Sequence, residues 1–408
     1  MNSGGPIMIM AGGTGGHVYP ALAVAEYLRA RGVSLFWLGT TRGIENRVVP
    51  QQGIELLTVR VSGVRGKGLQ SKLAAPVKIL AAIFQALYIC IRRRPAAALG
   101  MGGFASGPGG VAAWLLRIPL LIHEQNRVAG TTNRILARFA VKIMQGFPGT
   151  FEARAGAVTT GNPVRRQIAD LAGRKSSETK SRPAGDTISD WMPEQVRHDE
   201  EGPESRGQSK ITPARAGDPD NEDFTLTPAS VNVLILGGSQ GARKLNRVAP
   251  LALDRLQRRM KLNVRHQCGE RHLAETQRVY DGLQLDQVRL DPFIDDIASA
   301  YEWADIAVCR AGALTIAELC AAGLAAILVP FPYAIDDHQT ANARFLRDAG
   351  AALLLPEDEL TETGLEDLLW QLFSTEDRLS ELARNSRSCA FPDAAQAVGA
   401  LCLEHAYA

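Results

Sequence analysis

Short runs of apolar residues alternate with glycine-rich loops in the first part of the chain. The run at 6–11 (PIMIMA) is typical of a buried parallel strand, because it carries no polar side chain. It leads into the loop 12–17 (GGTGGH), and residues 21–30 then suit a helix that stops at Gly32. A second strand is expected at 34–38. Strand, glycine loop and helix in this order predict the opening unit of a doubly wound α/β domain.

The same pattern restarts in the second half of the chain. The apolar run 231–236 (VNVLIL) leads into a glycine loop at 237–241, which precedes another helical stretch. Further strands are expected at 119–123, 262–266, 288–290, 304–309 and 326–329. We therefore expect an α/β fold with two Rossmann-like domains, 1–168 and 229–385, whose parallel sheets face each other across a cleft. Residues 386–408 are expected to form a helix that returns to the first domain.

The segment 173–228 differs from both halves. It is polar, rich in proline, glycine and acidic residues, and poor in aliphatic residues. It shows neither helical nor strand periodicity, so we expect a disordered insertion between the domains.

Composition excludes several classes of protein. The 408 residues are 46% hydrophobic and 22% charged, and the formal net charge of +2 gives no reason to expect a nucleic-acid partner. The six cysteines are scattered and never form CxxC, which argues against a disulfide framework or a zinc site and favours a reducing compartment. No signal peptide is visible, and the longest apolar stretch, 79–91, is shorter than the roughly 20 residues that span a bilayer.

The stretch 309–323 (CRAGALTIAELCAAG) suggests a nucleotide site. An apolar run ends at Ala307-Val308, and Gly312 supplies a turn. Leu314-Thr315 then opens a helix, whose first N–H groups attract a diphosphate. Glu318 lies one turn further, where a carboxylate accepts hydrogen bonds from two vicinal hydroxyls, as in ribose. The alternative interpretation is an ordinary strand–helix unit in which Glu318 is a solvated acid.

Two common nucleotide motifs are absent. The dinucleotide fingerprint GxGxxG is broken by Val18, and the second strand runs into Gly39-Thr40-Thr41 without an acidic residue. No glycine loop is followed by GK[ST], so the Walker pattern also fails. We therefore expect neither NAD nor FAD, no other cofactor, and no metal.

The stretch 72–94 (KLAAPVKILAAIFQALYICIRRR) allows two interpretations. It is either a helix packed on the sheet with solvated basic residues, or a surface that meets anionic lipid head groups.

Nine motifs together resemble one known family. They are AGGTGGHVYPALAVA, VSGVRGKG, LGMGGFASGPGG, IHEQN, GNPVR, GGSQGAR, FIDDIASAY, CRAGALTIAEL and HQTAN. Their order is similar to that of the peripheral membrane glycosyltransferases of GT-B fold that add N-acetylglucosamine to lipid I, forming lipid II for peptidoglycan. The resemblance covers nearly the whole chain except 173–228. Ala311 and His338 depart from it, since serine and often glutamine stand there in the family.

The resemblance implies a set of substrate contacts. In the second domain, the main chain of Ile294 would bind uracil, Glu318 the ribose, and Ser239 with the Leu314 and Thr315 amides the diphosphate. Ala313, Ile316 and Ala317 belong to the same donor-binding helix start, Gln339 and Asn342 would read sugar hydroxyls, and Arg165 is a donor contact near the hinge. Thr14, Gly15 and Gly16 form the loop of the first domain that approaches both substrates, and Asn126 lies on the acceptor side.

The resemblance also implies the chemistry. Transfer inverts the anomeric centre and needs a base for the acceptor's 4-hydroxyl, for which His17 and Glu124 are competing candidates. His17 is alternatively a residue that only orients the glycine loop. The implied partners are UDP-N-acetylglucosamine, lipid I and the anionic surface of the inner membrane, with the protein peripheral on its cytoplasmic face.

Two other functions stay open at this point. The protein could bind a nucleotide sugar without turnover, as a regulatory relative, although His17, Glu124, Glu318 and Gln339 argue against this. It could also be a UDP-sugar epimerase of GT-B fold, which would need several acidic groups around the sugar.

Overall fold

The computed structural model describes residues 4–61, 75–171, 230–238 and 242–407. The predicted disordered insertion, 173–228, lies outside these ranges, as do Ser239 and most of the VSGVRGKG motif.

The first domain contains a seven-stranded parallel sheet in the order β3-β2-β1-β4-β5-β6-β7. Its strands are β1 (Ile7–Met10), β2 (Leu35–Thr40), β3 (Glu55–Val59), β4 (Ala97–Gly100), β5 (Leu120–Glu124), β6 (Lys142–Gln145) and β7 (Val158–Thr159). Its helices are α1 (Gly15–Arg29), α2 (Glu45–Gln51), α4 (Ala75–Arg93), α5 (Ser106–Leu115), α6 (Thr131–Leu136) and α7 (Arg166–Ala169), with a 3-10 turn at Ala153–Ala155.

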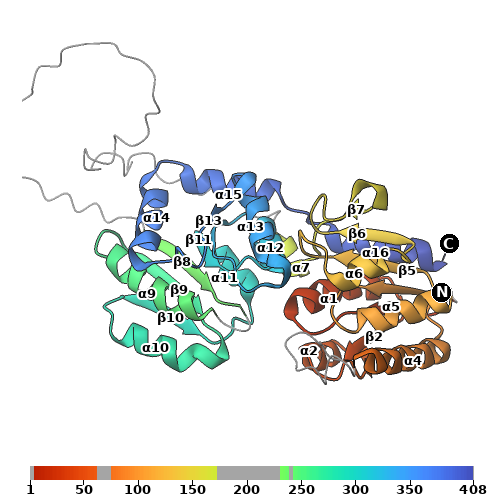
Figure 1. The fold of residues 1–408 in the computed structure, drawn as a ribbon. Helices are drawn as coiled ribbons and strands as arrows, with labels where there is room; N and C mark the ends of the chain where they lie inside the picture. Colours follow the sequence, from red (N-terminus) through yellow and green to blue (C-terminus); the bar gives the residue numbers. More distant parts are fainter. Residues whose placement is uncertain (1–3, 62–74, 172–229, 239–241, 408) are drawn as a thin grey trace, which may run out of the picture.

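The second domain contains a six-stranded parallel sheet in the order β10-β9-β8-β11-β12-β13. Its strands are β8 (Val231–Leu236), β9 (Leu262–Gln267), β10 (Gln287–Asp291), β11 (Ile306–Cys309), β12 (Ala325–Leu328) and β13 (Leu353–Leu354). Its helices are α9 (Arg243–Leu256), α10 (Leu273–Asp281), α11 (Ile297–Trp303), α12 (Ala313–Ala322), α13 (His338–Asp348), α14 (Glu362–Ser374) and α15 (Arg378–Ser388), followed by α16 (Ala394–Tyr407). Two 3-10 turns lie at Glu270–His272 and Ile335–Asp337. The two sheets, right and left in Figure 1, confirm the predicted α/β class.

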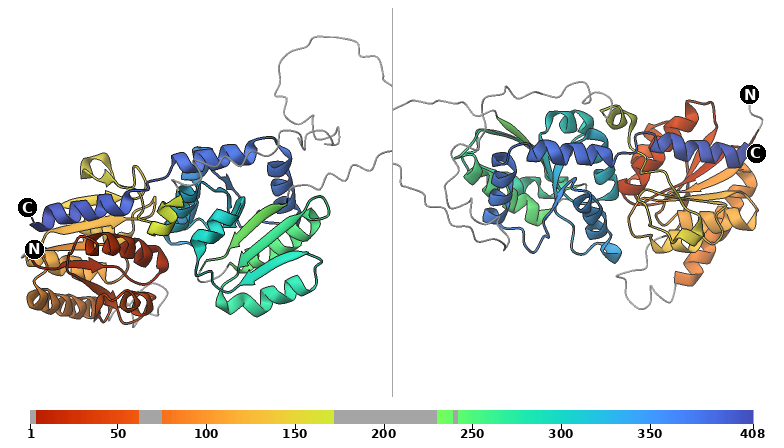
Figure 2. Two further views of the ribbon diagram at one scale, coloured as in Figure 1. Left: turned by 180° about the vertical axis from the view of Figure 1, so that it is seen from behind. Right: turned by 90° about the horizontal axis from the view of Figure 1, so that it is seen from above.

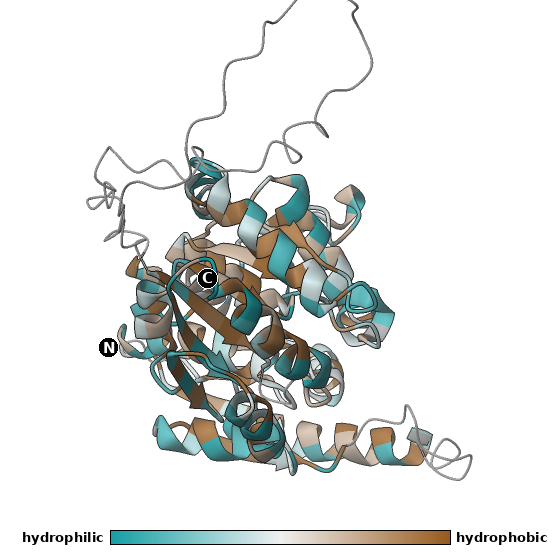
Figure 3. Cartoon of the chain, turned by 90° about the vertical axis from the view of Figure 1, so that its left-hand side faces the viewer, coloured by the Kyte–Doolittle hydropathy of each residue, from teal (hydrophilic) through white to brown (hydrophobic). Residues whose placement is uncertain are grey.

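The central strands explain why the sequence pattern was readable. β1, β4, β11 and β12 are buried at every position, because helices cover both faces of each sheet. In Figure 3 the strands are mostly coloured as hydrophobic, whereas the outer helices carry both colours. The strands that the sequence did not predict are short or partly exposed, such as β3 (ELLTV) and the two-residue β13. β3 and β13 lack a continuous apolar run, whereas β4 (AALG), which was not predicted either, is apolar but only four residues long.

The chain crosses between the domains twice. Val164, Ile168 and Leu171, around α7, are buried in a core cluster of the second domain. In the other direction, α16 packs on α1 and β4, and Val398 and Cys402 are buried in the core of the first domain. Figure 2 shows α16 lying along the first domain. The segment around α7 therefore completes the core of the second domain, and α16 completes the core of the first.

No helix in the described ranges is both long enough and apolar enough to cross a membrane.

Candidate active site at the domain junction

Both sheets reverse their strand order beside a glycine loop. In the first sheet the reversal lies between β1 and β4, and in the second between β8 and β11. Ligands of doubly wound folds bind outside the carboxyl ends of the strands at such points. The helices that follow β1 and β11, α1 and α12, contact each other at the domain junction (Figure 1).

The start of α12 offers free backbone donors. Gly312 is extended (φ −66°, ψ 142°), and the helix begins at Ala313, one residue earlier than expected. The hydrogen bond from Ile316 N to Gly312 O, 2.9 Å long, closes the first turn. The preceding amides of Ala313, Leu314 and Thr315 have no acceptor within the helix and lie at its positive end. This geometry suits a diphosphate.

Glu318 is a buried acid rather than a solvated one. Only 4% of the residue is exposed. Its Oε1 accepts a hydrogen bond from Arg165 Nη2 at 3.0 Å, and its Oε2 accepts one from Tyr301 Oη at 3.0 Å. Burial raises the pKa of Glu318, and the bonds with Arg165 and Tyr301 oppose that rise. The solvated-acid interpretation is therefore wrong, and Arg165 links the first domain to α12 through this ion pair.

The glycine loop of the first domain is anchored by an acid that sequence reasoning missed. Glu45, fully buried, accepts from Gly13 N at 2.9 Å and from Thr40 N and Oγ1 at 3.1 and 2.7 Å. A Cβ on Gly43, whose φ is +155°, would lie 2.1 Å from Glu45 Oε2, so glycine is needed there. In the sequence Glu45 looks like any first-turn helix acid, and only its neighbouring glycines hint at its role.

His17 lies in the first turn of α1 and is partly exposed. Its Nδ1 is 2.8 Å from Gln125 Oε1, at the carboxyl end of β5. The ring also lies against Gly102, where an added Cβ would come within 2.8 Å of the ring. Thr14, Gly15 and His17 thus form one edge of the junction, facing away from the core.

Glu124, the competing base, is committed to its own loop. It is 2% exposed. Oε1 accepts from Asn126 N at 3.0 Å and from Asn126 Nδ2 at 3.3 Å. Oε2 accepts from Gly130 N at 3.0 Å and from Asn133 Nδ2 at 2.9 Å. These four donors close the loop between β5 and α6, so the geometry favours a structural role for Glu124.

Asn342 bridges the domains. It is fully buried on α13, and its Oδ1 accepts from Arg127 N at 2.8 Å. Its Nδ2 donates to Asn126 Oδ1 and to Ala311 O, both at 3.2 Å. The polar groups of Asn342 that were expected to read sugar hydroxyls are engaged with the acceptor-side loop in this arrangement. Gln339, one turn earlier, accepts from Phe331 N at 2.9 Å.

The other predicted donor contacts lie around the second sheet. Ile294 follows β10 and is 4% exposed, so its side chain is core and its main chain alone remains available. Ile316 is buried and Ala317 partly buried in the core around α12. Ser239 lies outside the described residues.

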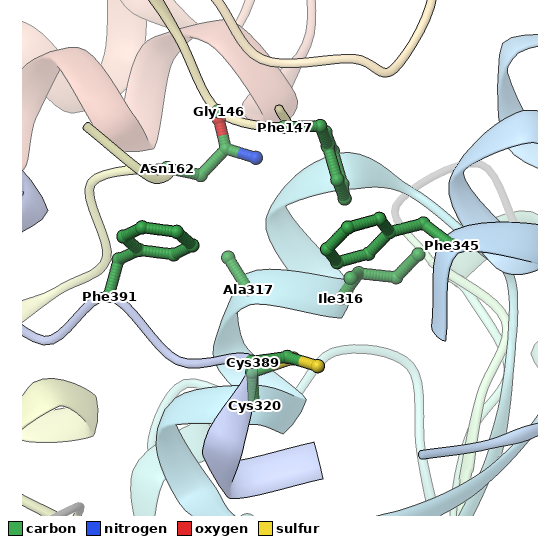
Figure 4. A pocket seen from close by; sticks show the side chains of 9 residues that line it. All are labelled: Gly146, Phe147, Asn162, Ile316, Ala317, Cys320, Phe345, Cys389 and Phe391. Atoms are coloured by element: carbon green, nitrogen blue, oxygen red, sulfur yellow. The ribbon is translucent and has the colours of Figure 1, made fainter. Parts of the chain in front are cut away.

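A small pocket also lies between the domains, lined by Asn162 and several apolar side chains. Phe147 of the first domain meets Phe345 of α13 edge to face, with ring centroids 5.1 Å apart. Ala317 of α12 and Phe391, which follows α15, line the pocket as well (Figure 4). Glu318 projects from roughly the opposite side of α12, since successive helical residues turn by about 100°. The side chains that line this pocket therefore serve to pack the two domains against each other.

Comparison with known proteins defines the class. Residues 7–145 match the glycosyltransferase family 28 N-terminal domain, and residues 232–398 match the glycosyltransferase family 28 C-terminal domain. The chain therefore belongs to glycosyltransferase family 28, and the predicted GT-B arrangement is confirmed.

Full-length relatives narrow the family further. A Methylococcus capsulatus protein, 48% identical with 98% of each chain covered, is named UDP-N-acetylglucosamine--N-acetylmuramyl-(pentapeptide) pyrophosphoryl-undecaprenol N-acetylglucosamine transferase. An Alkalilimnicola ehrlichii protein of the same name is 47% identical over 98% of this chain and 99% of its own. The crystal structure of Acinetobacter baumannii MurG is 38% identical, covers 98% of this chain and 99% of that chain, and gives a TM-score of 0.73. The chain belongs to the MurG family.

Proposed function

We propose that this protein transfers N-acetylglucosamine from UDP-N-acetylglucosamine to the 4-hydroxyl of the N-acetylmuramyl sugar of lipid I, giving lipid II. The observation that carries the proposal is the junction itself. The phosphate-suited start of α12 and the paired acid Glu318 lie on one side, and His17 lies on the other. The names of relatives that are 48% and 47% identical over 98% of the chain supply the two substrates.

The donor half of the proposal is electrostatic. The free amides of Ala313, Leu314 and Thr315 bind the diphosphate and stabilise the charge that develops as UDP leaves. Glu318 accepts from the ribose hydroxyls through the remaining lone pairs of its two oxygens, and Arg165 and Tyr301 hold it in place. Burial and the neighbouring Glu318 raise the pKa of Tyr301, so its hydroxyl stays a donor.

The acceptor half centres on His17. His17 Nε2 removes the proton of the acceptor hydroxyl while that oxygen bonds to the anomeric carbon, and the bond from this carbon to the diphosphate breaks. One such in-line displacement inverts the anomeric centre. His17 is the better base than Glu124, because all four contacts of the Glu124 carboxylate are loop donors.

We further propose that the outer face of α4 lies on the anionic cytoplasmic surface of the membrane. Ala82, Ala86 and Cys90 form the buried face of this helix. The opposite face exposes Val77, Leu80, Phe84, Tyr88 and Ile91, with Phe84 69% exposed. Ile79, three residues before Ala82 near the start of the helix, is 43% exposed. The packed-helix interpretation is confirmed for the buried face, and the exposed apolar side chains of the outer face support the proposed membrane contact. Arg92, whose guanidinium lies 5.3 Å from the centroid of the Tyr88 ring, attracts anionic head groups, whereas Arg93 forms an ion pair with Glu55 of β3.

Neighbouring helices extend the same face. α5 packs on α4, and its last turn exposes Trp114 and Leu115. Ile135 on α6 is 49% exposed. Together these side chains form an apolar rim on the domain that carries His17, the side from which a membrane-bound acceptor must approach.

The test is a turnover assay with purified protein, UDP-N-acetylglucosamine and a lipid I analogue in detergent. We expect UDP to be released only when the acceptor is present. Conversion of the donor sugar to its 2-epimer without acceptor would instead favour the epimerase alternative. Donor binding without UDP release under either condition would favour a non-catalytic relative.

A further inference from the structure

Two polar side chains, those of Gln125 and His123, connect His17 to a backbone carbonyl inside the first domain. His17 Nδ1 lies 2.8 Å from Gln125 Oε1. Gln125 Nε2 lies 3.2 Å from His123 Nδ1, and His123 Nε2 lies 2.9 Å from Gly161 O. Gln125 is 1% exposed and His123 is fully buried. The chain of contacts is thus shielded from water except at His17.

The Gly161 carbonyl sets the donor and acceptor of each hydrogen bond in this series. Gly161 O only accepts, so His123 Nε2 must carry the proton. Burial lowers the pKa of His123 to about 4, and the ring is neutral at physiological pH. Its Nδ1 is therefore an acceptor, and the Gln125 amide must turn its NH₂ toward it. The same NH₂ group also donates to His123 O at 3.1 Å.

The contact between Gln125 and His17 then fixes one tautomer of His17. The Gln125 amide presents its oxygen to His17, because its nitrogen is used by His123. An oxygen acceptor at 2.8 Å requires a proton on His17 Nδ1. The neutral ring therefore keeps an unprotonated Nε2, which is the nitrogen that a general base needs.

We propose that Gln125 is a positioning residue for sugar transfer, which holds His17 in the Nδ1–H tautomer and is itself oriented by His123. This inference rests on the proposed function, in which His17 is the base. Gly102 supports it sterically, since the imidazole lies where any larger residue would place a Cβ. Gln125 thus sets the rotation of the ring, and Gly102 provides the surface behind it.

Other charged groups near the start of α1 are already engaged. Glu124 on β5 accepts from four loop donors, and Glu45 on α2 accepts from Gly13 and Thr40. On α12, Glu318 pairs with Arg165, whose guanidinium lies 5.1 Å from the centroid of the Tyr19 ring on α1. The titratable groups of α16 are the buried Cys402, whose pKa is raised by burial, and Glu404, His405 and Tyr407 at the end of the helix. Tyr407 donates a hydrogen bond to Gly5 O, before β1. Within the described residues, none of these groups hydrogen-bonds to the His17 ring, whereas Gln125 does.

The test compares Gln125→Leu with Gln125→Glu. In Gln125→Leu the acceptor is gone, and we expect kcat to fall about 10- to 100-fold while KM for UDP-N-acetylglucosamine changes little. In Gln125→Glu a carboxylate still accepts from His17 Nδ1–H and restores much of kcat. The negative charge favours the imidazolium, so the acidic limb of the pH–rate profile moves to higher pH.

The tautomer is read directly by ¹⁵N NMR of histidine-labelled protein. We expect a His17 signal protonated at Nδ1 in the wild type and in Gln125→Glu, and its loss in Gln125→Leu. Gln145→Leu is the matched control. Gln145 is also a buried glutamine, 5% exposed, and lies on β6 opposite Glu124 of β5 in the strand register. This control variant should lose stability without changing the tautomer or the pH–rate profile.

A folded Gln125→Leu variant with an unchanged His17 signal and unchanged kcat overturns the inference. If that variant does not fold, an unshifted pH–rate profile in folded Gln125→Glu overturns it as well. The two failures are separable. Normal turnover in His17→Ala refutes the proposed base, whereas an inactive His17→Ala beside a fully active Gln125→Leu refutes only the role of Gln125.

Discussion

At the scale of single residues, the site depends on buried carboxylates that each accept several hydrogen bonds. Glu318, Glu45 and Glu124 are three buried carboxylates, and each binds at least two donors. A buried charge is costly unless it is paired, so such groups persist where they hold a defined geometry. Each therefore orders a different part of the junction: α12, the first glycine loop, and the loop after β5.

Replacing Glu318 with alanine tests the donor site. We expect Glu318→Ala to weaken UDP-N-acetylglucosamine binding by roughly 1.5–3 kcal/mol, the usual value of a hydrogen bond to a charged group. Isothermal titration calorimetry gives the affinity. Glu318→Gln is the control, because it keeps an acceptor for Tyr301 Oη but removes the charge that pairs with Arg165. Wild-type donor affinity in folded Glu318→Ala would exclude the ribose role.

Two buried histidines make stability depend on pH. Burial lowers the pKa of His123 to about 4 and that of His266 to about 3, from an ordinary value of 6.5. Below pH ~6.5 the unfolded chain binds protons at these rings before the folded chain does, so the free energy of unfolding falls as pH falls. The loss from His123 alone approaches roughly 3 kcal/mol by pH ~4, at about 1.4 kcal/mol per pKa unit.

Urea unfolding at several pH values between about 7 and 5 measures this slope. His266→Gln removes one titrating group whose ring contacts Tyr280 Oη and Asn246 Oδ1. We expect a less stable variant whose stability depends less steeply on pH. The same slope in both proteins would contradict the assignment of His266 as a buried neutral ring.

At the scale of elements, α4 packs against the domain with one face and exposes large apolar side chains on the other. α4 places alanines and Cys90 inward at intervals of four residues, and large apolar side chains outward. Spacing of i and i+4 places residues on one helical face, so the two roles do not compete.

Ile79→Glu with Phe84→Glu tests the membrane face. Both side chains are exposed, at 43% and 69%, so the variant should fold normally. We expect weaker binding to anionic vesicles, because two new negative charges meet anionic head groups, and unchanged turnover of a short-chain soluble acceptor. Vesicle flotation and a UDP-release assay give the two values.

Its controls separate charge from position. Gln277→Glu with Gln371→Glu adds the same charge to exposed sites of the second domain and should leave vesicle binding unchanged. His17→Ala should show the reverse pattern, with normal vesicle binding and turnover reduced ~10²- to 10⁴-fold. Normal vesicle binding by the folded α4 variant would place the membrane face elsewhere.

At the scale of the whole molecule, the two domains share elements. α7 lies in the core around α12, whereas α16 leaves the second domain and completes the core of the first. Asn342 and Arg165 form polar contacts between the same two domains, beside the site. The relative position of His17 and α12 therefore depends on packing as well as on the substrates.

Val398→Ala measures the contribution of α16 to the first domain. Val398 is fully buried, and losing its two methyl groups should lower the free energy of unfolding by roughly 1–3 kcal/mol through lost burial and a residual cavity. Differential scanning calorimetry should show a lower transition temperature. Leu401→Ala, at a partly buried position of the same helix, is the milder control. An unchanged transition in Val398→Ala would mean that α16 does not stabilise the domain.

The sequence by itself determined the strands and helices that depend on residues close together along the chain. Continuous apolar runs predicted the central strands, and glycine loops followed by helical stretches predicted both Rossmann-like units, because strand burial and helix starts leave direct traces in residue order. The same local pattern placed a phosphate-suited helix start at 314–315 and singled out Glu318, whereas His17 was singled out by the family resemblance.

Only the tertiary structure decided which polar groups meet. That Glu318 pairs with Arg165, that Glu45 anchors Gly13, and that Gln125 connects His17 to His123 depends on contacts between segments that are far apart along the chain. The burial that separates a structural acid such as Glu124 from a reactive group likewise arises only when the loop between β5 and α6 closes around it. Residue type and spacing define what a side chain can do, but its solvation and partners are set by the packed fold, and these determine its role.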